Sequence, residues 1–240
     1  MITQFKEKNY SSRDVYVSDT ELWIRSIFYT IQGEGPYAGH PAVFVRLAGC
    51  NRGDKETGCQ FCDTDFLLSS SEKLKIDSIV KEVQKYDTNI VVVTGGEPMM
   101  HQTLAALVDV LDYLGYTVQI ETNGDYVRED SLPKATIVAS PKVGKHGYVR
   151  PPNGMLGRVD YLKFVVSADP TSLYHNLPLY VHDFAKERGN RRVFVSPINE
   201  YTRPVKPSEI ASIWSDMYDR PRCALNHTHA AELALSLIHI

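Results

Sequence analysis

The sequence has no long hydrophobic run and no excess of charge of either sign. Its apolar stretches are far shorter than the roughly 18 residues that indicate a membrane-spanning helix. Its 240 residues include 26 lysines and arginines against 29 aspartates and glutamates, for a formal net charge of −3, and there is no basic run. Because nucleic acids and anionic membranes attract clustered positive charge, the sequence predicts neither as a partner.

Cysteine is also scarce, and the histidines show little metal-binding pattern. There are four cysteines, of which Cys50, Cys59 and Cys62 fall in one polar loop with the spacing C-x8-C-x2-C. The first 20 residues lack an apolar signal-peptide segment, so we expect a reducing, cytoplasmic environment in which thiols stay free. His227-Thr228-His229 is only a weak metal pattern, and no nearby histidine or cysteine completes a four-ligand zinc site.

Three thiolates favour a [4Fe–4S] cluster with one open iron, to which a reactive cofactor can bind. Buried structural thiols and an incomplete zinc site are the alternative interpretations. Phe61, which lies within this loop, could stack on a nucleoside or could simply pack. Thr64 offers a hydroxyl to a hard cation, but it could equally serve as a turn residue.

Most of the chain alternates apolar strands with amphipathic helices. We expect strands at 23–30, 41–48, 89–94, 117–121, 136–140, 161–166 and 192–196, and helices at 76–86, 104–114, 179–188, 207–218 and 226–234. This alternation predicts one α/β domain over residues 21–234, a mainly parallel sheet or partial barrel preceded by an arm at 1–20. In such folds the site lies at the carboxyl ends of the strands, and we expect every motif to lie there.

Two further groups of residues are candidates for binding. Gly95 and Gly96 follow a buried strand and could let the backbone approach a ligand closely, although a tight turn explains them too, and Glu97 could be a first-turn helix charge. Gln32, Glu34 and Arg46 could recognise a heterocycle and a carboxylate. An arginine among apolar strand residues is unfavourable unless it is paired, and a salt bridge at a strand edge is the alternative.

Several motifs together carry a resemblance to a known family. They are IQGEG at 31–35, GHP at 39–41, FVRL at 44–47, GCN at 49–51, CQFCDT at 59–64, TGGEP at 94–98, ETNG at 121–124 and SPK at 140–142. With them the sequence resembles radical S-adenosylmethionine (SAM) enzymes over residues 21–234 and, within these, the 7-carboxy-7-deazaguanine synthase family. The cysteine spacing departs from the common C-x3-C-x2-C, but longer cluster loops do occur in this synthase family.

The resemblance implies a reduced βα partial barrel, usually a homodimer, that binds a [4Fe–4S] cluster, SAM and Mg²⁺. It implies a 5′-deoxyadenosyl radical that starts the conversion of 6-carboxy-5,6,7,8-tetrahydropterin to 7-carboxy-7-deazaguanine with loss of ammonia, a carbon–nitrogen lyase reaction of 7-deazapurine (queuosine-type) biosynthesis. The implied cluster ligands are Cys50, Cys59 and Cys62, and the Mg²⁺ ligand is Thr64. The SAM positions are Phe61, Cys62, Asp63, Gly96, Ser140, Pro141, Lys142, Ser196 and Pro197, and the substrate positions are Ile31, Gln32, Gly33, Glu34, Arg46 and Thr94.

An electron donor, flavodoxin-like in kind, is the other implied partner. The alternative functions are a glycyl-radical-enzyme activase, which should lack the pocket of Gln32, Glu34 and Arg46, and a non-catalytic metal-binding module. At the C-terminus the family pattern breaks off. We expect the natural sequence to be cut short near Ala234, with residues 235–240 a non-native tail in which His239 is accidental.

Overall fold

The chain forms a curved, open sheet of nine strands. The computed structural model describes residues 3–4, 20–53, 59, 61–62, 64–130, 132–189, 192–202 and 217–238. The strand order is β1-β2-β3-β5-β6-β7-β10-β11, and β4 pairs with β2. These strands are β1 (Thr3–Gln4), β2 (Glu21–Ile31), β3 (Pro41–Leu47), β4 (Glu72–Lys75), β5 (Ile90–Gly95), β6 (Thr117–Thr122), β7 (Ala135–Ala139), β10 (Tyr161–Val166) and β11 (Val193–Pro197). A separate two-stranded sheet pairs β8 (Val143–Gly144) with β9 (Gly147–Tyr148).

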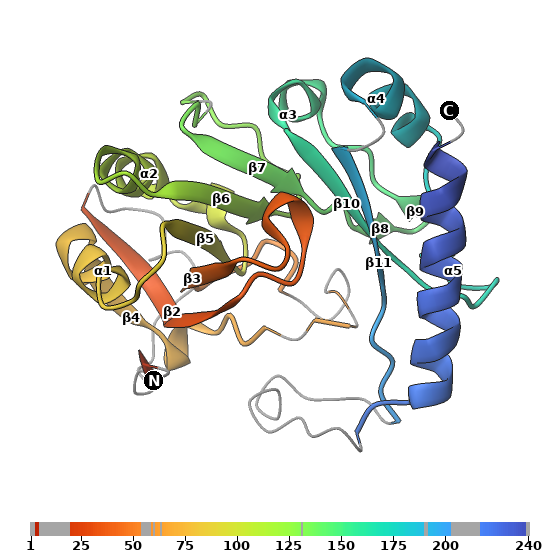
Figure 1. The fold of residues 1–240 in the computed structure, drawn as a ribbon, viewed down its shortest axis with the longest axis horizontal. Helices are drawn as coiled ribbons and strands as arrows, with labels where there is room; N and C mark the ends of the chain where they lie inside the picture. Colours follow the sequence, from red (N-terminus) through yellow and green to blue (C-terminus); the bar gives the residue numbers. More distant parts are fainter. Residues whose placement is uncertain are drawn as a thin grey trace.

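The helices cover the outer face of this sheet (Figure 1). They are α1 (Ile76–Val83), α2 (Leu104–Tyr113), α3 (Asn153–Arg158), α4 (Tyr180–Arg188) and α5 (Arg220–Ile238), with short 3₁₀ turns η2 (Gly35–Tyr37), η3 (Leu68–Ser70) and η4 (Pro98–Met100). Figure 1 shows α1 to α4 in an arc behind the strands and α5 beside β11. Within the described ranges no helix has the length and apolarity to cross a membrane.

The parallel strands bury different side chains on their two faces. On the outer face, Val45, Val93 and Ile120 are fully buried in the main core. Burial of each such side chain stabilises the fold by roughly 1.5–3 kcal/mol. On the inner face, Val92 packs with Tyr37 in a smaller apolar cluster. Polar side chains replace apolar ones on this inner face toward the carboxyl ends of the strands, so a polar chamber lies above an apolar base.

The predicted fold class is confirmed. Strands β3, β5, β6, β7, β10 and β11 pair in parallel, and the seven predicted strands and the helices at 76–86, 104–114 and 179–188 are present with small shifts of their ends. The short elements β4, β8, β9 and α3 were not predicted. Most of the predicted helix at 207–218, and all of the predicted arm at 1–20 except 3–4 and 20, lie outside the described residues.

The last predicted helix is longer than expected. Helix α5 begins at Arg220, and it continues through the residues that we expect to be a non-native tail as far as Ile238. Within that tail Leu237 is 3% exposed and packs in the main core. Leu237 of the expected tail is therefore part of the hydrophobic core.

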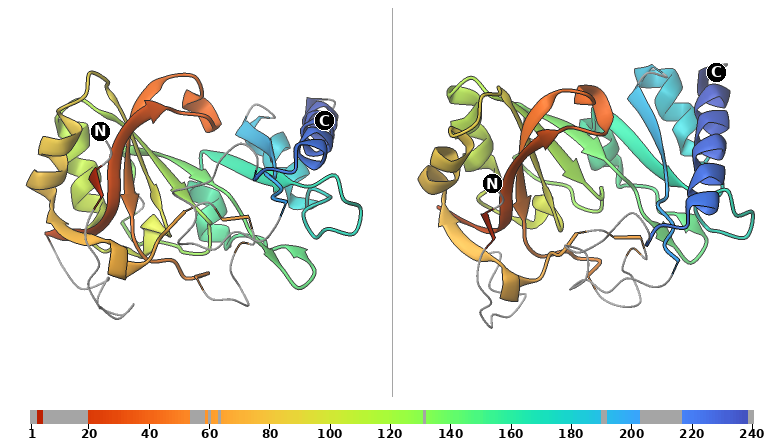
Figure 2. Two further views of the ribbon diagram at one scale, coloured as in Figure 1. Left: turned by 90° about the horizontal axis from the view of Figure 1, so that it is seen from below. Right: turned by 60° about the horizontal axis from the view of Figure 1, so that its bottom comes forward.

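One expectation about topology is wrong. Strand β2 runs antiparallel to β3, with Ile31 opposite Pro41, so the IQGEG segment leaves β2 at the amino edge of the parallel strands rather than at their carboxyl edge. The alternation of side chains in a strand does not reveal the strand's direction. The segment nevertheless reaches the chamber, because the β2–β3 hairpin arches over the inner face of the sheet (Figure 2).

Candidate active site

A cavity of about 230 Å³ lies over the carboxyl ends of the parallel strands. Its walls come from the exits of β3, β5, β6, β7 and β11, from the inner faces of β6 and β10, and from the arching hairpin. The lining residues are Glu34, Cys50, Arg52, Cys59, Phe61, Cys62, Thr64, Phe66, Thr94, Gly95, Gly96, Glu121, Thr122, Asn123, Ser140, Lys142, Lys163, Val165, Pro197, Asn199 and Tyr201. Segments distant in sequence thus meet at one site, as expected of a parallel α/β fold.

The Gly95-Gly96 turn brings the exits of β5 and β3 into backbone contact. A Cβ atom at Gly95 would lie 2.1 Å from the Leu47 carbonyl oxygen, and one at Gly96 would lie 1.7 Å from the Gly49 carbonyl oxygen. Gly95 also has a φ of +128°, which favours glycine. The backbone of the two glycines therefore lies close to the exit of the neighbouring strand β3, and this contact holds the segment before Cys50 in place. Gly96 also lines the cavity.

Glu97 is a buried anchor rather than a first-turn helix charge. Its carboxylate accepts hydrogen bonds from the Met99 backbone N–H at 2.9 Å, the Thr122 hydroxyl at 2.7 Å and the Asn123 backbone N–H at 2.7 Å. Burial raises the pKa of Glu97 to about 7, and these three donors oppose that rise. Glu97 thereby joins the exit of β5 to the exit of β6.

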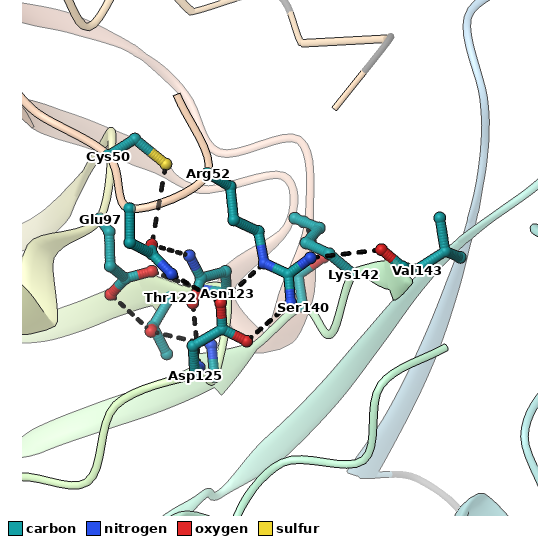
Figure 3. A network of polar contacts seen from close by, with 11 residues as sticks. Cys50, Arg52, Glu97, Thr122, Asn123, Asp125, Ser140, Lys142 and Val143 are labelled. Atoms are coloured by element: carbon teal, nitrogen blue, oxygen red, sulfur yellow. Dashed lines mark hydrogen bonds and ion pairs between the residues drawn. The ribbon is translucent and has the colours of Figure 1, made fainter. Parts of the chain in front are cut away.

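A network of polar side chains continues from Glu97 toward the cysteine loop (Figure 3). The Asn123 amide donates to the Asn51 side-chain oxygen at 2.7 Å, and the Asn51 amide donates to Asp125 at 2.7 Å. Asp125 also accepts two hydrogen bonds from the Arg52 guanidinium, at 2.7 and 2.9 Å. Asp125 raises the pKa of Arg52, so the guanidinium stays charged. Arg52 and Asp125 were not among the predicted site residues.

The three cysteines of the loop line the same cavity, and all four cysteines are free thiols. Burial raises the pKa of Cys50 to about 11, and the nearby carboxylate of Glu97 and thiols of Cys59 and Cys62 raise it further. A cation bound beside Cys50 would favour its thiolate.

A carboxylate on the inner face gathers several of the predicted substrate residues. Glu121 accepts hydrogen bonds from the amides of Gln32 at 3.0 Å and Gln119 at 3.1 Å, and from the Thr94 hydroxyl at 3.0 Å. Gln119 is completely buried, and its side-chain oxygen is without a hydrogen-bond partner among the described residues. Sequence reasoning did not single out Glu121, although it lies in the ETNG motif.

Two lysines add positive charge to the chamber. Lys163 on β10 forms an ion pair with Glu34 of the hairpin, and its side chain is 12% exposed. Lys142 donates to the Ser140 hydroxyl at 2.8 Å, and burial lowers the pKa of Lys142. The alternative interpretation of Lys142 and Lys163 was a charge exposed to solvent. Their position in the cavity wall argues against that interpretation.

The aromatic and hydroxyl residues of the cysteine loop also reach the cavity. The ring of Phe61 lines it and packs edge-to-face on Tyr174, with 5.2 Å between the ring centroids. Thr64 lines it as well. The carboxylate of Asp65 instead binds Arg25 through two hydrogen bonds of 3.0 and 2.8 Å, whereas the predicted SAM position Asp63 lies outside the described residues.

The remaining predicted residues do not line the cavity. Arg46 lies beside Thr94 in an interior strand, so the strand-edge alternative does not hold, and its guanidinium covers the Phe28 ring at 5.2 Å. Ile31 is 65% exposed and Gly33 is also exposed, whereas Gln32 is buried and reaches the chamber through Glu121. Pro141 and Ser196 stand next to lining residues without lining the cavity themselves.

Comparison with known proteins decides the family. A model of the Radical SAM superfamily matches residues 45–135. A 7-carboxy-7-deazaguanine synthase from Rhodospirillum rubrum is 38% identical over 197 residues, which cover 78% of this chain and 79% of that relative. The chain belongs to the 7-carboxy-7-deazaguanine synthase family of radical SAM enzymes. The relative of that name from Rickettsia prowazekii is 43% identical over 157 residues, or 62% of this chain and 63% of its own length.

A solved structure supports membership of the synthase family. The crystal structure of QueE from Escherichia coli aligns with a TM-score of 0.53 and 26% sequence identity, over 74% of this chain and 84% of that chain. Matches to some curated relatives, including the one from Rickettsia prowazekii, span less than two thirds of the relative's length. Residues of the family motifs line the cavity described above, and the shared fold brings them together there.

The donor set fits the cluster and SAM on which radical SAM chemistry depends. Three free thiols of one loop line one cavity, together with glycine backbone and basic side chains that suit an amino acid and a nucleoside. In the part of the chain that is described, no three His, Cys, Asp or Glu side chains stand close enough to hold a single metal ion. A cluster of several irons tolerates a wider spacing of ligands than a structural zinc ion does.

Proposed function

We propose that this protein converts 6-carboxy-5,6,7,8-tetrahydropterin to 7-carboxy-7-deazaguanine and ammonia, in 7-deazapurine biosynthesis. The observation that carries the proposal is one cavity in which three cysteine thiols face a polar inner wall of carboxylates, amides and lysines. The atoms of the product and ammonia together equal those of the substrate, so no external oxidant is needed if SAM is regenerated. The curated relatives named above support this activity.

The cysteines Cys50, Cys59 and Cys62 would hold the cluster, and Gly96, Ser140 and Lys142 would bind SAM beside it. When bound, the cluster and SAM supply the radical that removes a hydrogen atom from the substrate. The protein's own task is to orient the substrate and to keep water away from the reacting atoms. Burial lowers the pKa of Lys142, so its ammonium favours an anionic partner such as the SAM carboxylate.

The inner wall would recognise the pterin. Glu34 and Glu121 are carboxylates that can accept hydrogen bonds from its N–H groups, and the buried amides of Gln32 and Gln119 hold Glu121 in place. The ion pair between Glu34 and Lys163 fixes the hairpin over the chamber. We further propose that Thr64 binds Mg²⁺ through its hydroxyl, because that oxygen donor lines the cavity next to the cluster segment.

The testing experiment is anaerobic reconstitution with iron and sulfide, followed by dithionite, SAM and the tetrahydropterin, with products identified by mass spectrometry. Formation of 7-carboxy-7-deazaguanine supports the proposal. Formation of 5′-deoxyadenosine alone would point to another substrate, or to loss of function through the C-terminal tail. If the protein takes up no iron, the alternative interpretation holds, in which the cysteines are structural.

A matched pair of variants tests the substrate assignment. Lys163→Met should raise the KM for the pterin about tenfold, since one lost charge-assisted contact corresponds to roughly 1.4 kcal/mol, whereas Lys163→Arg should keep most of the affinity. SAM binding should be unchanged in both variants. Equal loss of SAM and pterin binding in Lys163→Met would contradict the assignment.

The structure gives no support to the two alternative functions. An activase of glycyl-radical enzymes acts on a protein backbone, whereas Gln32 and Glu34 here lie over a small, polar cavity. A closed metal-binding module does not explain the half-buried carboxylate of Glu121 in the cavity wall. We propose a flavodoxin-like electron donor, a homodimer and a cytoplasmic location on the family resemblance, and sedimentation of the loaded protein would test the dimer.

A further inference from the structure

Arg52 is fixed in orientation although it belongs to a surface loop. It lies two residues after Cys50, and its guanidinium makes two hydrogen bonds to Asp125, at 2.7 and 2.9 Å, and a third of 3.2 Å to the Val143 carbonyl oxygen. Only 13% of the Arg52 side chain and 23% of the Asp125 side chain are exposed. A bidentate pair at this burial is far more rigid than an ordinary surface ion pair.

Asp125 is itself held by a closed ring of amides. Asn51 donates to its carboxylate at 2.7 Å, Asn123 donates to Asn51 at 2.7 Å, and the Asp125 backbone N–H donates to the Asn123 side-chain oxygen at 2.9 Å. Asn51 lies between Cys50 and Arg52 in the sequence. The ring therefore ties the cysteine loop to the exit of β6, and it places the carboxylate behind the guanidinium (Figure 3).

The positive end of this pair faces the cysteines. Arg52 lines both the 230 Å³ cavity and a neighbouring cavity of about 950 Å³, and Cys59 lines both of them too, whereas Asp125 lines neither. Arg52 therefore stands beside Cys59 at the boundary between the two cavities.

We propose that Arg52 is a positioning residue that raises the reduction potential of the cluster bound by Cys50, Cys59 and Cys62, with Asp125 holding its guanidinium in place. Reduction adds a negative charge to the cluster, and a nearby cation favours the reduced form. An easily reduced cluster matters because the reaction begins with one electron. This inference rests on the proposed cluster assignment.

The test is a redox titration, followed by electron paramagnetic resonance, of reconstituted wild-type protein, Arg52→Met and Asp125→Asn without SAM. Arg52→Met leaves an uncompensated carboxylate and should lower the reduced-to-oxidised ratio about tenfold at a fixed ambient potential, which is about 59 mV for one electron. Asp125→Asn leaves an uncompensated cation and should move that ratio in the opposite direction. If the pair of Arg52 and Asp125 has only a structural role, both variants should change the reduced-to-oxidised ratio in the same direction. That result would overturn the proposal.

Control variants separate charge from folding. Lys134→Met removes the same charge from a pair with Asp109 remote from the cysteines and should leave the potential unchanged. Arg52→Lys keeps the cation and should stay within a few-fold of the wild-type ratio. If Arg52→Met assembles no cluster, the near-wild-type ratio expected for Arg52→Lys and the raised ratio expected for Asp125→Asn still decide. Failure of the wild-type protein to bind iron would instead refute the proposed function.

Discussion

Single residues at the exits of β3 and β5 determine whether the cysteine loop can take its position. At Gly96 the space for a side chain is occupied by the Gly49 backbone, 1.7 Å from the place where a Cβ atom would lie. Backbone cannot move aside as a flexible side chain can, so any other residue must push the two exits apart. The glycine is thus required by strand packing before any ligand is considered.

Gly96→Ala is expected to destabilise the protein by about 3 kcal/mol or more, the upper range of overpacking, and to lower iron uptake after reconstitution. Thermal unfolding of the apoprotein and the iron content measure the two effects. Gly157→Ala in α3 is the matched control, because nothing lies within 4 Å of its Cβ position, and alanine there should stabilise by up to about 1 kcal/mol. A Gly96→Ala variant as stable as wild type would contradict the packing argument.

His101 gives the fold a pH dependence of known sign. It is 2% exposed and donates from Nε2 to the Ala48 carbonyl oxygen at 2.9 Å, and burial lowers its pKa to about 4. An unfolded histidine titrates near pH 6.5. Between these values the unfolded chain binds a proton that the folded chain does not. The stability that His101 contributes is therefore complete above pH 6.5 and is lost as the pH falls toward 4.

His101→Gln should be less sensitive to acid than the wild-type protein. From pH 7.5 to pH 5 the wild-type free energy of unfolding should fall by about 2 kcal/mol relative to the variant, at 1.36 kcal/mol per pH unit. Urea unfolding of both apoproteins across this range measures the difference. The raised pKa of Glu97 acts with the opposite sign, but it is common to both proteins and cancels. Parallel pH profiles would show that His101 does not titrate in this way.

The residue types of the site could be predicted from the sequence, but their partners could not. The cysteines, the glycine pair and Lys142 were all expected at the site, and they line one cavity. The pairing of Arg52 with Asp125 spans 73 residues and joins the exits of β3 and β6, which lie on either side of β5 in the sheet. Neither residue forms a local motif, so only the folded sheet reveals the pair.

Elements were easier to predict than their directions. The two strands β2 and β3 follow from their apolar alternation, yet that pattern is the same for either direction of a strand. The direction of β2 matters for the IQGEG segment. This segment starts at the amino edge of the parallel strands and reaches the chamber only because the β2–β3 hairpin folds back over the sheet. A hydrogen bond of 3.1 Å between the hydroxyls of Tyr37 and Thr136 helps to hold the hairpin over the sheet. These two residues are 99 positions apart in the sequence.

A buried amide joins helix α5 to the sheet, in addition to the apolar packing of Ala230 and Leu237 in the main core. Asn226 is 2% exposed, accepts a hydrogen bond from the Ala168 backbone N–H at 2.7 Å and donates to the Ile198 carbonyl oxygen at 2.9 Å. It therefore joins the exits of β10 and β11 to the helix. Removing the amide leaves two backbone groups without their partner, each at about 1–3 kcal/mol.

Asn226→Ala should accordingly lower the free energy of unfolding by about 2–4 kcal/mol, measured by urea unfolding. Thr228→Ala on the same helix is the control and should change it by less than about 0.5 kcal/mol, because Thr228 is exposed and its hydroxyl donates to the Ala224 carbonyl oxygen of its own helix. Similar effects of the two substitutions would mean that the amide bridge does not anchor α5.

Across the whole molecule, the shortest register between parallel strands lies between β7 and β10. Their register contains two residue pairs, Tyr161 with Val138 and Leu162 with Ala139, whereas β6 with β7 and β10 with β11 contain five each. Strand β10 begins where β7 ends, so the two diverge toward the carboxyl edge. The active-site cavity lies across this junction, with the cysteine loop on one side and Pro197 on the other.

Ligands that fill the cavity should therefore join the two parts of the sheet. In the apoprotein, backbone amides of β10 and β11 should exchange with deuterium faster than those of β5 and β6, because few hydrogen bonds connect the C-terminal part to the rest. Loading with the cluster and SAM should slow exchange in β10 and β11 several-fold more than in β5 and β6, since a ligand stabilises the state that binds it. Mass spectrometry of exchanged peptides measures both effects. Equal protection of all four strands in the apoprotein would show that the short β7–β10 register is not a weak junction.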